Sequence, residues 1–203
     1  MFILAIKLIL FDLGGVVFNR FNRAQFAKDI KADITPEEFG KYLYTENYFE
    51  KFEKSLATKE DYAKYVKTVS NSPMDISEII YYYKKNLGNI NLHSFKAFSE
   101  FKNMGLEVGI LSNISYFWAS EIDEVIKVLD ADYIFYSYKI GMIKPYEKIY
   151  RYVLDNVPYK PEEIIFLDDN LNNIEAAKKM GIVGIQVKFD DMYEIIHLIK
   201  SYI

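Results

Sequence analysis

Three patterns of apolar and polar residues follow one another along the chain. Residues 8–11 form an unbroken apolar run, which ends at Asp12 and is typical of a strand covered on both faces inside a parallel sheet. From about residue 18 to residue 88, apolar and aromatic residues recur three or four positions apart, a spacing that predicts helices. The five helices predicted there are residues 22–32, 36–44, 46–54, 58–70 and 75–87.

Beyond residue 90, helical and strand patterns alternate. The predicted strands are residues 107–112, 133–137, 164–168 and 183–187, and the predicted helices are residues 91–104, 115–129, 145–156, 171–180 and 190–201. Parallel strands need long crossover connections, so this alternation indicates an α/β fold with a doubly wound parallel sheet that includes the first strand. We therefore predict an α/β core domain, residues 1–17 and 89–203, with an all-helical cap domain, residues 18–88, inserted after the first strand.

Composition and charge narrow the classes of function. With 51% hydrophobic residues, the 203-residue chain supports one substantial core and a small insertion. Its 25 Lys and Arg residues against 29 Asp and Glu residues give a net charge of -4, and no basic block of the kind that binds nucleic acid or a membrane surface is present. We therefore expect a small-molecule or protein partner. A monomer or a weak homodimer is also expected.

The residue types also limit the available chemistry. The apolar start, MFILAIKLILF, is too short for a membrane span and lacks a signal-peptide cleavage pattern, so a soluble, cytoplasmic protein is expected. The sequence has no Cys, which removes disulfides and thiolate nucleophiles. Its two histidines, His93 and His197, lie outside any recognisable motif. Acid, base or metal chemistry must therefore rest on carboxylates, Lys, Ser or Tyr.

Polar residues of these types are placed where they are expected to meet. The carboxyl ends of strands in an open α/β sheet border the crevice where ligands bind. We expect strand ends to bring six residues to this crevice, namely Asp12, Ser112, Asn113, Lys144, Asp168 and Asp169. Gly14 and Gly15 let the backbone after Asp12 turn sharply and approach a ligand closely.

The acidic pair Asp168 and Asp169 is the most specific of these signals. Together with Asp12 it places three carboxylates at one edge of the sheet, where they repel unless a cation intervenes, and hard oxygen ligands suit Mg²⁺. The alternative is that the pair only caps the helix that follows. Ser112 and Asn113 similarly form either a plain turn or an anion site.

Lys144 adds the cation that such a site requires. A Lys before Pro145 is, taken alone, most often a solvated surface residue. Together with a carboxylate nucleophile, hydroxyl and amide donors and an acid-bound Mg²⁺, it completes the residue set of a phosphoryl-transfer site.

Four segments resemble, in their order, the motifs of the haloacid dehalogenase-like hydrolase superfamily: ILFDLGGVVF, ILSN, GMIKPYEKIY and IIFLDDNLNNIEAAKKMGI. With the cap segment FEKFEKSLATKEDYAKYV, they are most similar to bacterial sugar phosphatases of the alpha-glucose-1-phosphate phosphatase type and to the phosphatase domain of bifunctional epoxide hydrolases. The resemblance implies a Mg²⁺-dependent phosphatase of small phosphorylated metabolites, such as sugar phosphates, that forms an aspartyl-phosphate.

The resemblance also implies a role for each candidate residue. Asp12 would be the nucleophile, and Lys144 would neutralise charge on it and on the phosphoryl group. The substrate phosphoryl group would be bound by Ser112, Asn113 and Gly15. The metal would be held by Asp12, the carbonyl of Gly14 and Asp168, with Asp169 acting indirectly or through water, and the supporting residues would be Asn170 and Asn173.

One position departs from the family pattern. Most phosphatases of the superfamily carry an acid/base Asp two residues after the nucleophile, and here that position is Gly14. This predicts a slow enzyme, a substrate with a good leaving group, or a substitute acid from the cap. It also leaves two alternatives open: a 2-haloacid dehalogenase, against which the acid pair argues, and a non-catalytic protein that binds a phosphorylated ligand or partner.

Overall fold

A five-stranded parallel sheet forms the centre of the protein. The computed structural model describes residues 6–43 and 46–200. The strands are β1 (Leu8–Phe11), β2 (Glu107–Ser112), β3 (Tyr133–Tyr136), β4 (Ile164–Asp168) and β5 (Val183–Gln186), in the spatial order β3-β2-β1-β4-β5. All pairings are parallel, and Leu8 lies opposite Glu107 on one side and Ile164 on the other. The strand order therefore reverses between β1 and β4. This is the topological switch point of the sheet, where ligands bind in such folds.

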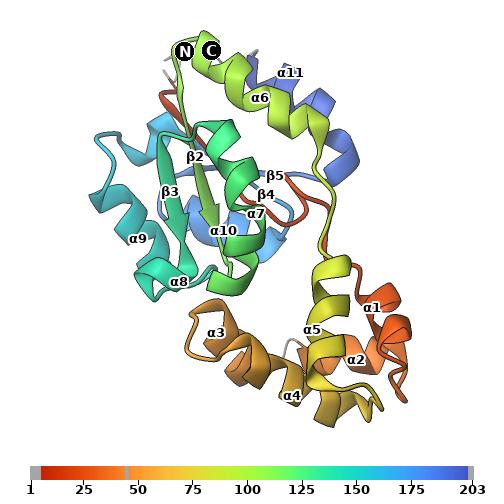
Figure 1. Cartoon of the computed structure of the whole chain (residues 1–203). Coiled ribbons are helices and arrows are strands. Elements are labelled where there is room, and N and C mark those ends of the chain that lie inside the picture. The colour runs from red at the N-terminus through yellow and green to blue at the C-terminus, as the bar shows by residue number, and fades with distance from the viewer. Residues whose placement is uncertain (1–5, 44–45, 201–203) are drawn as a thin grey trace.

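Helices cover both faces of the sheet (Figure 1). One face packs against α6 (Leu92–Asn103), α7 (Tyr116–Leu129) and α11 (Met192–Lys200), and the other against α9 (Glu147–Asp155) and α10 (Leu171–Lys179). Side chains alternate along β1, so Ile9 and Phe11 join the first core and Leu8 and Leu10 the second. The fold is thus the predicted α/β class with a doubly wound sheet.

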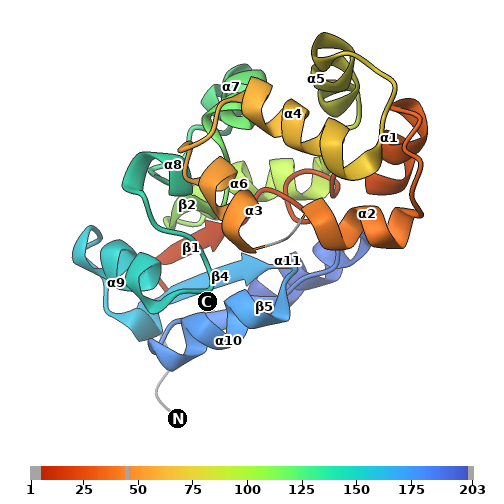
Figure 2. The same cartoon turned by 90° about the horizontal axis from the view of Figure 1, so that it is seen from below.

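Five helices lie between β1 and α6, in the segment predicted to form the cap. They are α1 (Arg23–Asp29), α2 (Pro36–Leu43), α3 (Glu46–Glu53), α4 (Lys59–Ser70) and α5 (Ile76–Lys85), and we call residues 23–85 the helical cap. Thr58 and Asp75 begin α4 and α5 with complete capping boxes. The cap has a core of its own, centred on Phe26, Phe39 and Val66. Figures 1 and 2 show it at the end of the sheet toward which the strands point.

Helix α3 joins the cap to the core domain through hydrogen bonds. The Ser137 hydroxyl donates to the carbonyl of Glu53 over 2.7 Å. The backbone N–H of Tyr116, at the start of α7, donates to the Ser55 hydroxyl over 2.8 Å. Both contacts lie at the C-terminal end of α3, so this end of the helix is anchored directly to the core domain.

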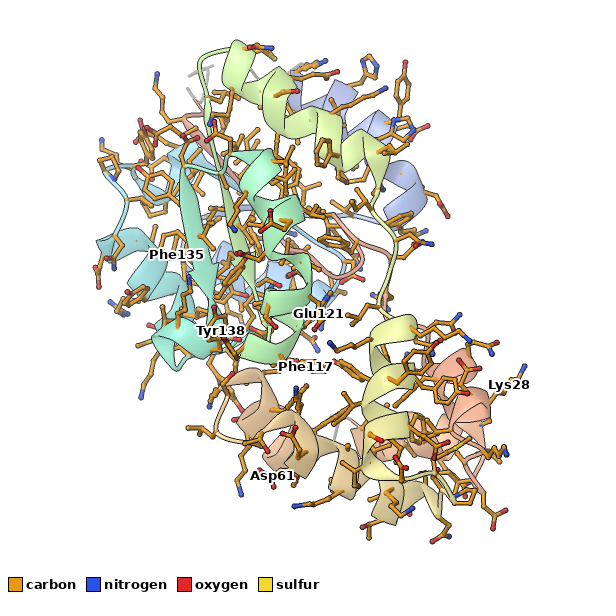
Figure 3. The ribbon with its side chains drawn as sticks, viewed as in Figure 1. Lys28, Asp61, Phe117, Glu121, Phe135 and Tyr138 are labelled. Atoms are coloured by element: carbon orange, nitrogen blue, oxygen red, sulfur yellow. The ribbon has the colours of Figure 1, made fainter. Side chains whose placement is uncertain are left out.

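Helix α5 makes a second junction with α7. Lys84 pairs with Glu121, and the ring of Tyr83 stacks on that of Phe117 with centroids 5.7 Å apart. Phe117 and Glu121 lie on the side of α7 that faces the cap (Figure 3). Phe117 belongs to the hydrophobic cluster of the cap although it comes from the core domain, so the two parts share apolar packing.

The sequence-based positions of the strands agree with the structure within one or two residues at either end, with one consequential difference. The strand predicted at 133–137 ends at Tyr136, and Ser137–Ile140 form a one-turn helix, α8, that stops at Gly141 with φ of 69°. A single turn is too short to show a helical period. Lys144 therefore does not follow a strand directly but lies in the loop after α8, and the next helix begins at Glu147 instead of residue 145.

Two 3₁₀ turns complete the described chain, at Pro161–Glu163 and Phe189–Asp191. Within the described residues, every helix falls short of the length and apolar character that crossing a membrane requires.

Candidate active site

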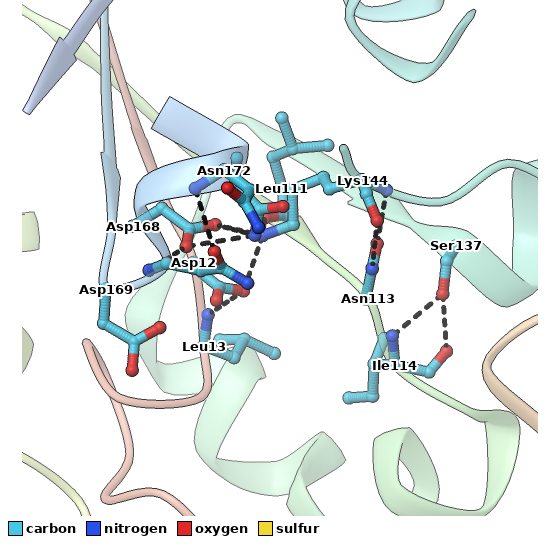
Figure 4. A network of polar contacts seen from close by, with 12 residues as sticks. Asp12, Leu13, Leu111, Asn113, Ile114, Ser137, Lys144, Asp168, Asp169 and Asn172 are labelled. Atoms are coloured by element: carbon cyan, nitrogen blue, oxygen red, sulfur yellow. Dashed lines mark hydrogen bonds and ion pairs between the residues drawn. The ribbon is translucent and has the colours of Figure 1, made fainter. Parts of the chain in front are cut away.

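Asp12 occupies the position directly after the central strand. Its backbone N–H donates to the carbonyl of Leu167 over 2.8 Å, which continues the ladder between β1 and β4. The residue is 8% exposed, and Oδ1 accepts a hydrogen bond of 2.7 Å from the N–H of Leu13. The carboxylate is therefore held in one orientation at the switch point of the sheet (Figure 4).

Lys144 is buried against two carboxylates. Its Nζ lies 2.6 Å from Oδ2 of Asp168 and 3.0 Å from Oδ1 of Asp12, and it donates to the carbonyl of Leu111 over 2.9 Å. Burial by itself would lower the pKa of Lys144, but Asp12 and Asp168 outweigh burial and raise the pKa above its usual value. The expectation for an isolated Lys-Pro pair, a solvated surface side chain, is therefore wrong at this position.

The loop that carries Lys144 is tied to the end of β2. The side-chain amide of Asn113 donates to the carbonyl of Lys144 over 2.9 Å and accepts from its N–H over 2.8 Å. Lys144 does not follow a strand directly, but this double hydrogen bond fixes its backbone beside the end of β2. The Ser112 hydroxyl is buried beside the Asp12 carboxylate, and its interaction with that carboxylate opposes the rise in the pKa of Asp12 that burial causes.

Asp168 is completely buried and surrounded by donors. Oδ1 accepts from the N–H of Asn170 over 2.8 Å, and the amide of Asn173 lies 2.9 Å from Oδ2 and 3.1 Å from Oδ1. The first turn of α10 is capped by Asn170, whose side chain accepts from the N–H of Asn172. Helix capping therefore does not account for the two aspartates, because Asn170 performs it.

Asp169 points toward the backbone turn after Asp12. A Cβ atom at Gly15, whose φ is 84°, would lie 1.9 Å from Oδ2 of Asp169, so only glycine fits there. Oδ2 also pairs with Arg20, which comes from the segment between β1 and α1. Burial raises the pKa of Asp169, and Arg20 partly counteracts this shift. No motif in the sequence pointed to Arg20.

Three carboxylates converge at this point. Asp12, Asp168 and Asp169 each offer an oxygen, and these atoms lie within 4.8 Å of one another. Lys144 pairs with Asp12 and Asp168, and Arg20 pairs with Asp169, so the protein supplies two cations to this cluster. Clustered carboxylate oxygens of this kind suit a hard divalent cation such as Mg²⁺, so the residues present fit the predicted metal.

A cavity of about 430 Å³ lies over these groups, between the core domain and the cap. From the core domain it is lined by Asp12, Gly14, Ser112, Asn113, Trp118, Lys144, Asp169, Asn170 and Asn173, and from the cap and its two connecting segments by Arg20, Phe21, Arg23, Leu43, Glu53, Tyr62, Tyr83 and Leu87. The candidate residues from both ends of the sequence thus border one space, whose cap side is mainly aromatic and apolar.

Glu53 is the residue of this cavity that the sequence did not single out. It is the last residue of α3 and only 5% of its surface is exposed. Burial, reinforced by the charge of Asp12 and opposed by Lys144, raises the pKa of Glu53 to about 8. A glutamate in an amphipathic helix is ordinarily a solvated residue, so the sequence offered only a weak signal for it.

Comparison with known proteins agrees with the geometry. A family model for haloacid dehalogenase-like hydrolases matches residues 6–181. Bifunctional epoxide hydrolase 2 of Mus musculus is 28% identical over 203 residues, which cover 91% of this chain and 37% of that protein. The chain therefore spans little more than a third of this relative. Sesquiterpene phosphatase astK of Aspergillus oryzae is 27% identical over 184 residues, 89% of each chain.

A solved structure shows the same fold. The family enzyme bt-2542 from Bacteroides thetaiotaomicron, in complex with magnesium and inorganic phosphate, superposes with a TM-score of 0.75 at 21% identity, covering 90% of this chain and 94% of that one. At this identity the likeness concerns the arrangement of the chain.

Proposed function

Because the chain belongs to the haloacid dehalogenase-like hydrolase family, we propose that it is a Mg²⁺-dependent phosphatase of small phosphate monoesters. The observation that carries the proposal is the buried Lys144, paired with both Asp12 and Asp168 beside a third carboxylate. A cation buried between two acids at the switch point of the sheet suits a reaction in which negative charge is transferred.

The three carboxylates are the proposed metal ligands. Asp12, Asp168 and Asp169, with the carbonyl of Gly14, would hold Mg²⁺, and the cation would offset negative charge on the phosphoryl group as it transfers. Both oxygens of Asp168 already accept hydrogen bonds from the protein, whereas Asp169 borders the cavity. Asp169 is accordingly the more direct metal ligand of the pair in this proposal.

The protein groups divide the reaction between them. Asp12 attacks phosphorus and forms an aspartyl-phosphate, and water then releases inorganic phosphate and restores the carboxylate. The Ser112 hydroxyl, which lies beside the Asp12 carboxylate, binds a phosphoryl oxygen, and Lys144 offsets the charge on Asp12 and on the phosphoryl group. The Asn113 side chain holds the Lys144 loop, so its part in binding the phosphoryl group falls to its backbone N–H.

The cavity lining indicates what the phosphate is attached to. Phe21, Leu43, Tyr62 and Trp118 give the leaving-group side an aromatic and apolar surface, next to the polar residues at the phosphoryl end. Rings of this kind pack against the apolar faces of sugars as well as against hydrocarbon chains. We therefore propose sugar phosphates and apolar alkyl phosphates as the substrate classes to compare.

The test is a turnover screen of the wild-type protein with Mg²⁺ and with excess chelator. The panel contains sugar phosphates, prenyl and other alkyl phosphates, p-nitrophenyl phosphate and 2-chloropropionate, with release of phosphate or chloride as the readout. Asp12→Asn is expected to abolish phosphate release, and the exposed Asp155→Asn is the matched control. Activity that persists in chelator, or chloride release without phosphate release, would overturn the proposal.

A further inference from the structure

The cavity contains a buried carboxyl group with an unused oxygen. Glu53 is 95% removed from solvent, and among the described residues its Oε2 has no hydrogen-bond partner. Burying a polar atom without a partner costs about 1–3 kcal/mol, so such atoms in native proteins call for an explanation. Glu53 is one of the residues that line the cavity together with Asp12, Ser112 and Lys144.

The structure holds the backbone of Glu53 in place. The carbonyl of Glu53 accepts a hydrogen bond from Ser137, whose hydroxyl oxygen in turn accepts from the N–H of Ile114 over 2.8 Å. Ile114 lies two residues after Ser112, so the end of α3 is joined to the loop that carries the phosphoryl-binding hydroxyl. The backbone from which the Glu53 side chain extends is therefore fixed relative to that loop, and such positioning favours a group that acts in an active site.

The core domain itself offers no acid at the expected position. Gly14 stands where most phosphatases of the family have their acid/base Asp, and the space beside its Cα faces Trp118, whose Cη2 atom lies 3.4 Å from where a Cβ would be. On the opposite, cap side of the cavity stands Glu53. Among the described residues that line the cavity, Glu53 is therefore the one carboxyl group that belongs neither to the nucleophile nor to the metal site.

We propose that Glu53 is the general acid and base of the reaction, supplied by the cap in place of the missing Asp at position 14. The proposal rests on the phosphatase function proposed above. It makes the reaction depend on the cap being seated on the core domain, because the nucleophile and the acid come from different parts of the fold.

The two half-reactions balance. In the first, Oδ of Asp12 bonds to phosphorus, the bond from phosphorus to the leaving oxygen breaks, and that oxygen takes its bonding electrons and the proton of Glu53, which releases an alcohol. In the second, the water oxygen bonds to phosphorus, and the Glu53 carboxylate accepts a proton from that water. The bond to Asp12 then breaks, so that inorganic phosphate leaves with both carboxyl groups restored.

The protonation state of Glu53 agrees with this order of events. Since burial and Asp12 raise the pKa of Glu53 to about 8, the carboxyl carries its proton at neutral pH and is ready to act first as an acid. Activity that needs this proton should decline as pH rises through about 8. The charged and titratable groups that border the same cavity are Asp12, Lys144, Asp169, Arg20, Arg23, Tyr62 and Tyr83.

The test is the isosteric Glu53→Gln, compared with wild type on an alkyl phosphate and on p-nitrophenyl phosphate. Protonation matters most for a poor leaving group, so alkyl turnover is expected to fall by about 10²–10⁴-fold and aryl turnover by less than about 10-fold. Glu50→Gln, on the same helix, is the control, and circular dichroism checks that all variants are folded.

A second variant provides a rescue. Gly14→Asp in the Glu53→Gln background is expected to restore part of the alkyl turnover, because a Cβ at position 14 makes only ordinary contacts with Trp118. Wild type should also lose alkyl turnover above about pH 8, and the Gln variant should lack this decline.

The possible failures have different signatures. An unchanged alkyl-to-aryl ratio in Glu53→Gln overturns the role of Glu53 while leaving the phosphatase intact. Equal losses on both substrates overturn it as well, because they mark a structural role. Wild type that releases no phosphate from any substrate overturns the phosphatase itself, and the role of Glu53 with it.

Discussion

At the scale of one residue, Lys144 balances the negative charge of two buried carboxylates in the site. Asp12 and Asp168 are both buried, and the ammonium group lies within 3.0 Å of each. Burial of a carboxylate is costly unless it is paired, so Lys144 stabilises the fold as well as the negative charge of the reaction. A residue with both tasks connects stability to activity, and the two effects can be separated by pH.

Lys144→Met is expected to lower the free energy of unfolding by about 3–5 kcal/mol at pH 8, because it leaves buried carboxylates without their cation. Burial raises the pKa of Asp12 above its unfolded value, and losing Lys144 raises it further. A carboxyl group whose pKa is higher in the folded than in the unfolded state destabilises the fold at pH values above the folded-state pKa, and has no effect below the unfolded-state pKa. The loss of stability in Lys144→Met should therefore shrink toward pH 5. Urea unfolding in chelator at both pH values measures this.

The exposed Lys179→Met on α10 is the matched control. If its loss of stability equals that of Lys144→Met, or if the loss for Lys144→Met is the same at pH 5 and pH 8, then the ion pairs do not stabilise the fold in this way.

The contacts of Asp168 and Asp169 reverse the metal-binding roles that we expected for them. From the sequence, Asp168 is expected to bind the metal directly and Asp169 indirectly. The structure surrounds Asp168 with Lys144, Asn170 and Asn173, while Asp169 borders the cavity. We therefore reverse the expectation.

Asp169→Asn is expected to weaken Mg²⁺ binding by at least about 10-fold, which corresponds to a loss of about 1.4 kcal/mol in binding free energy. The loss should be larger than that caused by Asp168→Asn. Asp168→Asn is instead expected to lower stability more, since it disturbs a buried ion pair. The single tryptophan, Trp118, lines the cavity, so its fluorescence provides a Mg²⁺ titration that does not depend on turnover. Equal losses of affinity, or a larger loss for Asp168→Asn, would restore the sequence-based order.

At the scale of elements, the one-turn helix α8 connects the cap to the catalytic strands. Ser137 is fully buried, and its hydroxyl contacts the carbonyl of Glu53, the N–H of Ile114 and the carbonyl of Ile114. α8 thus places the end of α3, and with it Glu53, next to the end of β2. A four-residue element determines the relative position of two groups that lie far apart in sequence.

Ser137→Ala is expected to cost about 1–3 kcal/mol, because it leaves the Ile114 N–H and the Glu53 carbonyl buried without a partner. Because the variant also frees the end of α3, alkyl turnover should fall more than aryl turnover. Thermal unfolding and the alkyl-to-aryl ratio are the measurements, and Ser99→Ala on the exposed face of α6 is the control. A ratio that stays at the wild-type value would show that α8 does not position Glu53.

At the scale of the whole molecule, the cap and the core domain are held together by apolar packing as well as by polar contacts. Phe117 extends from α7 into the hydrophobic cluster of the cap, where it stacks on Tyr83, and Lys84 pairs with Glu121 alongside. This junction joins the two parts of the fold that line the cavity. The packing of the cap on the core domain therefore covers one side of the site and brings Glu53 to it.

Phe117→Ala is expected to lower the free energy of unfolding by about 3–5 kcal/mol, the usual cost of removing a buried phenylalanine ring. It should also raise KM more than it lowers kcat for aryl phosphates, because the cap closes less tightly over bound substrate. Urea unfolding and steady-state kinetics measure the two effects. Val128→Ala, exposed on the same helix, should change neither, and an equal effect of both variants would contradict the role of Phe117.

The sequence by itself determined the class of fold and most of the residues that meet at the sheet edge. Apolar runs ending in Asp12, Ser112 and Asp168 predicted the strands, and in a parallel sheet the ends of neighbouring strands must lie at one edge. Local periodicity and chain order are enough for this, because each element depends mainly on its own residues. The four motifs led to the family, which the match to residues 6–181 confirms.

Only the tertiary structure decided how those residues are used. The burial of Lys144 between two carboxylates, the pairing of Arg20 with Asp169 and the arrival of Glu53 from the cap all join segments that are distant in sequence. Such contacts depend on how the cap packs on the core domain, and the periodicity of apolar residues within single helices and strands does not predict them. A glutamate that looks solvated in its own helix becomes buried only when a second domain covers it, and this is the physical reason that the sequence could not reveal its role.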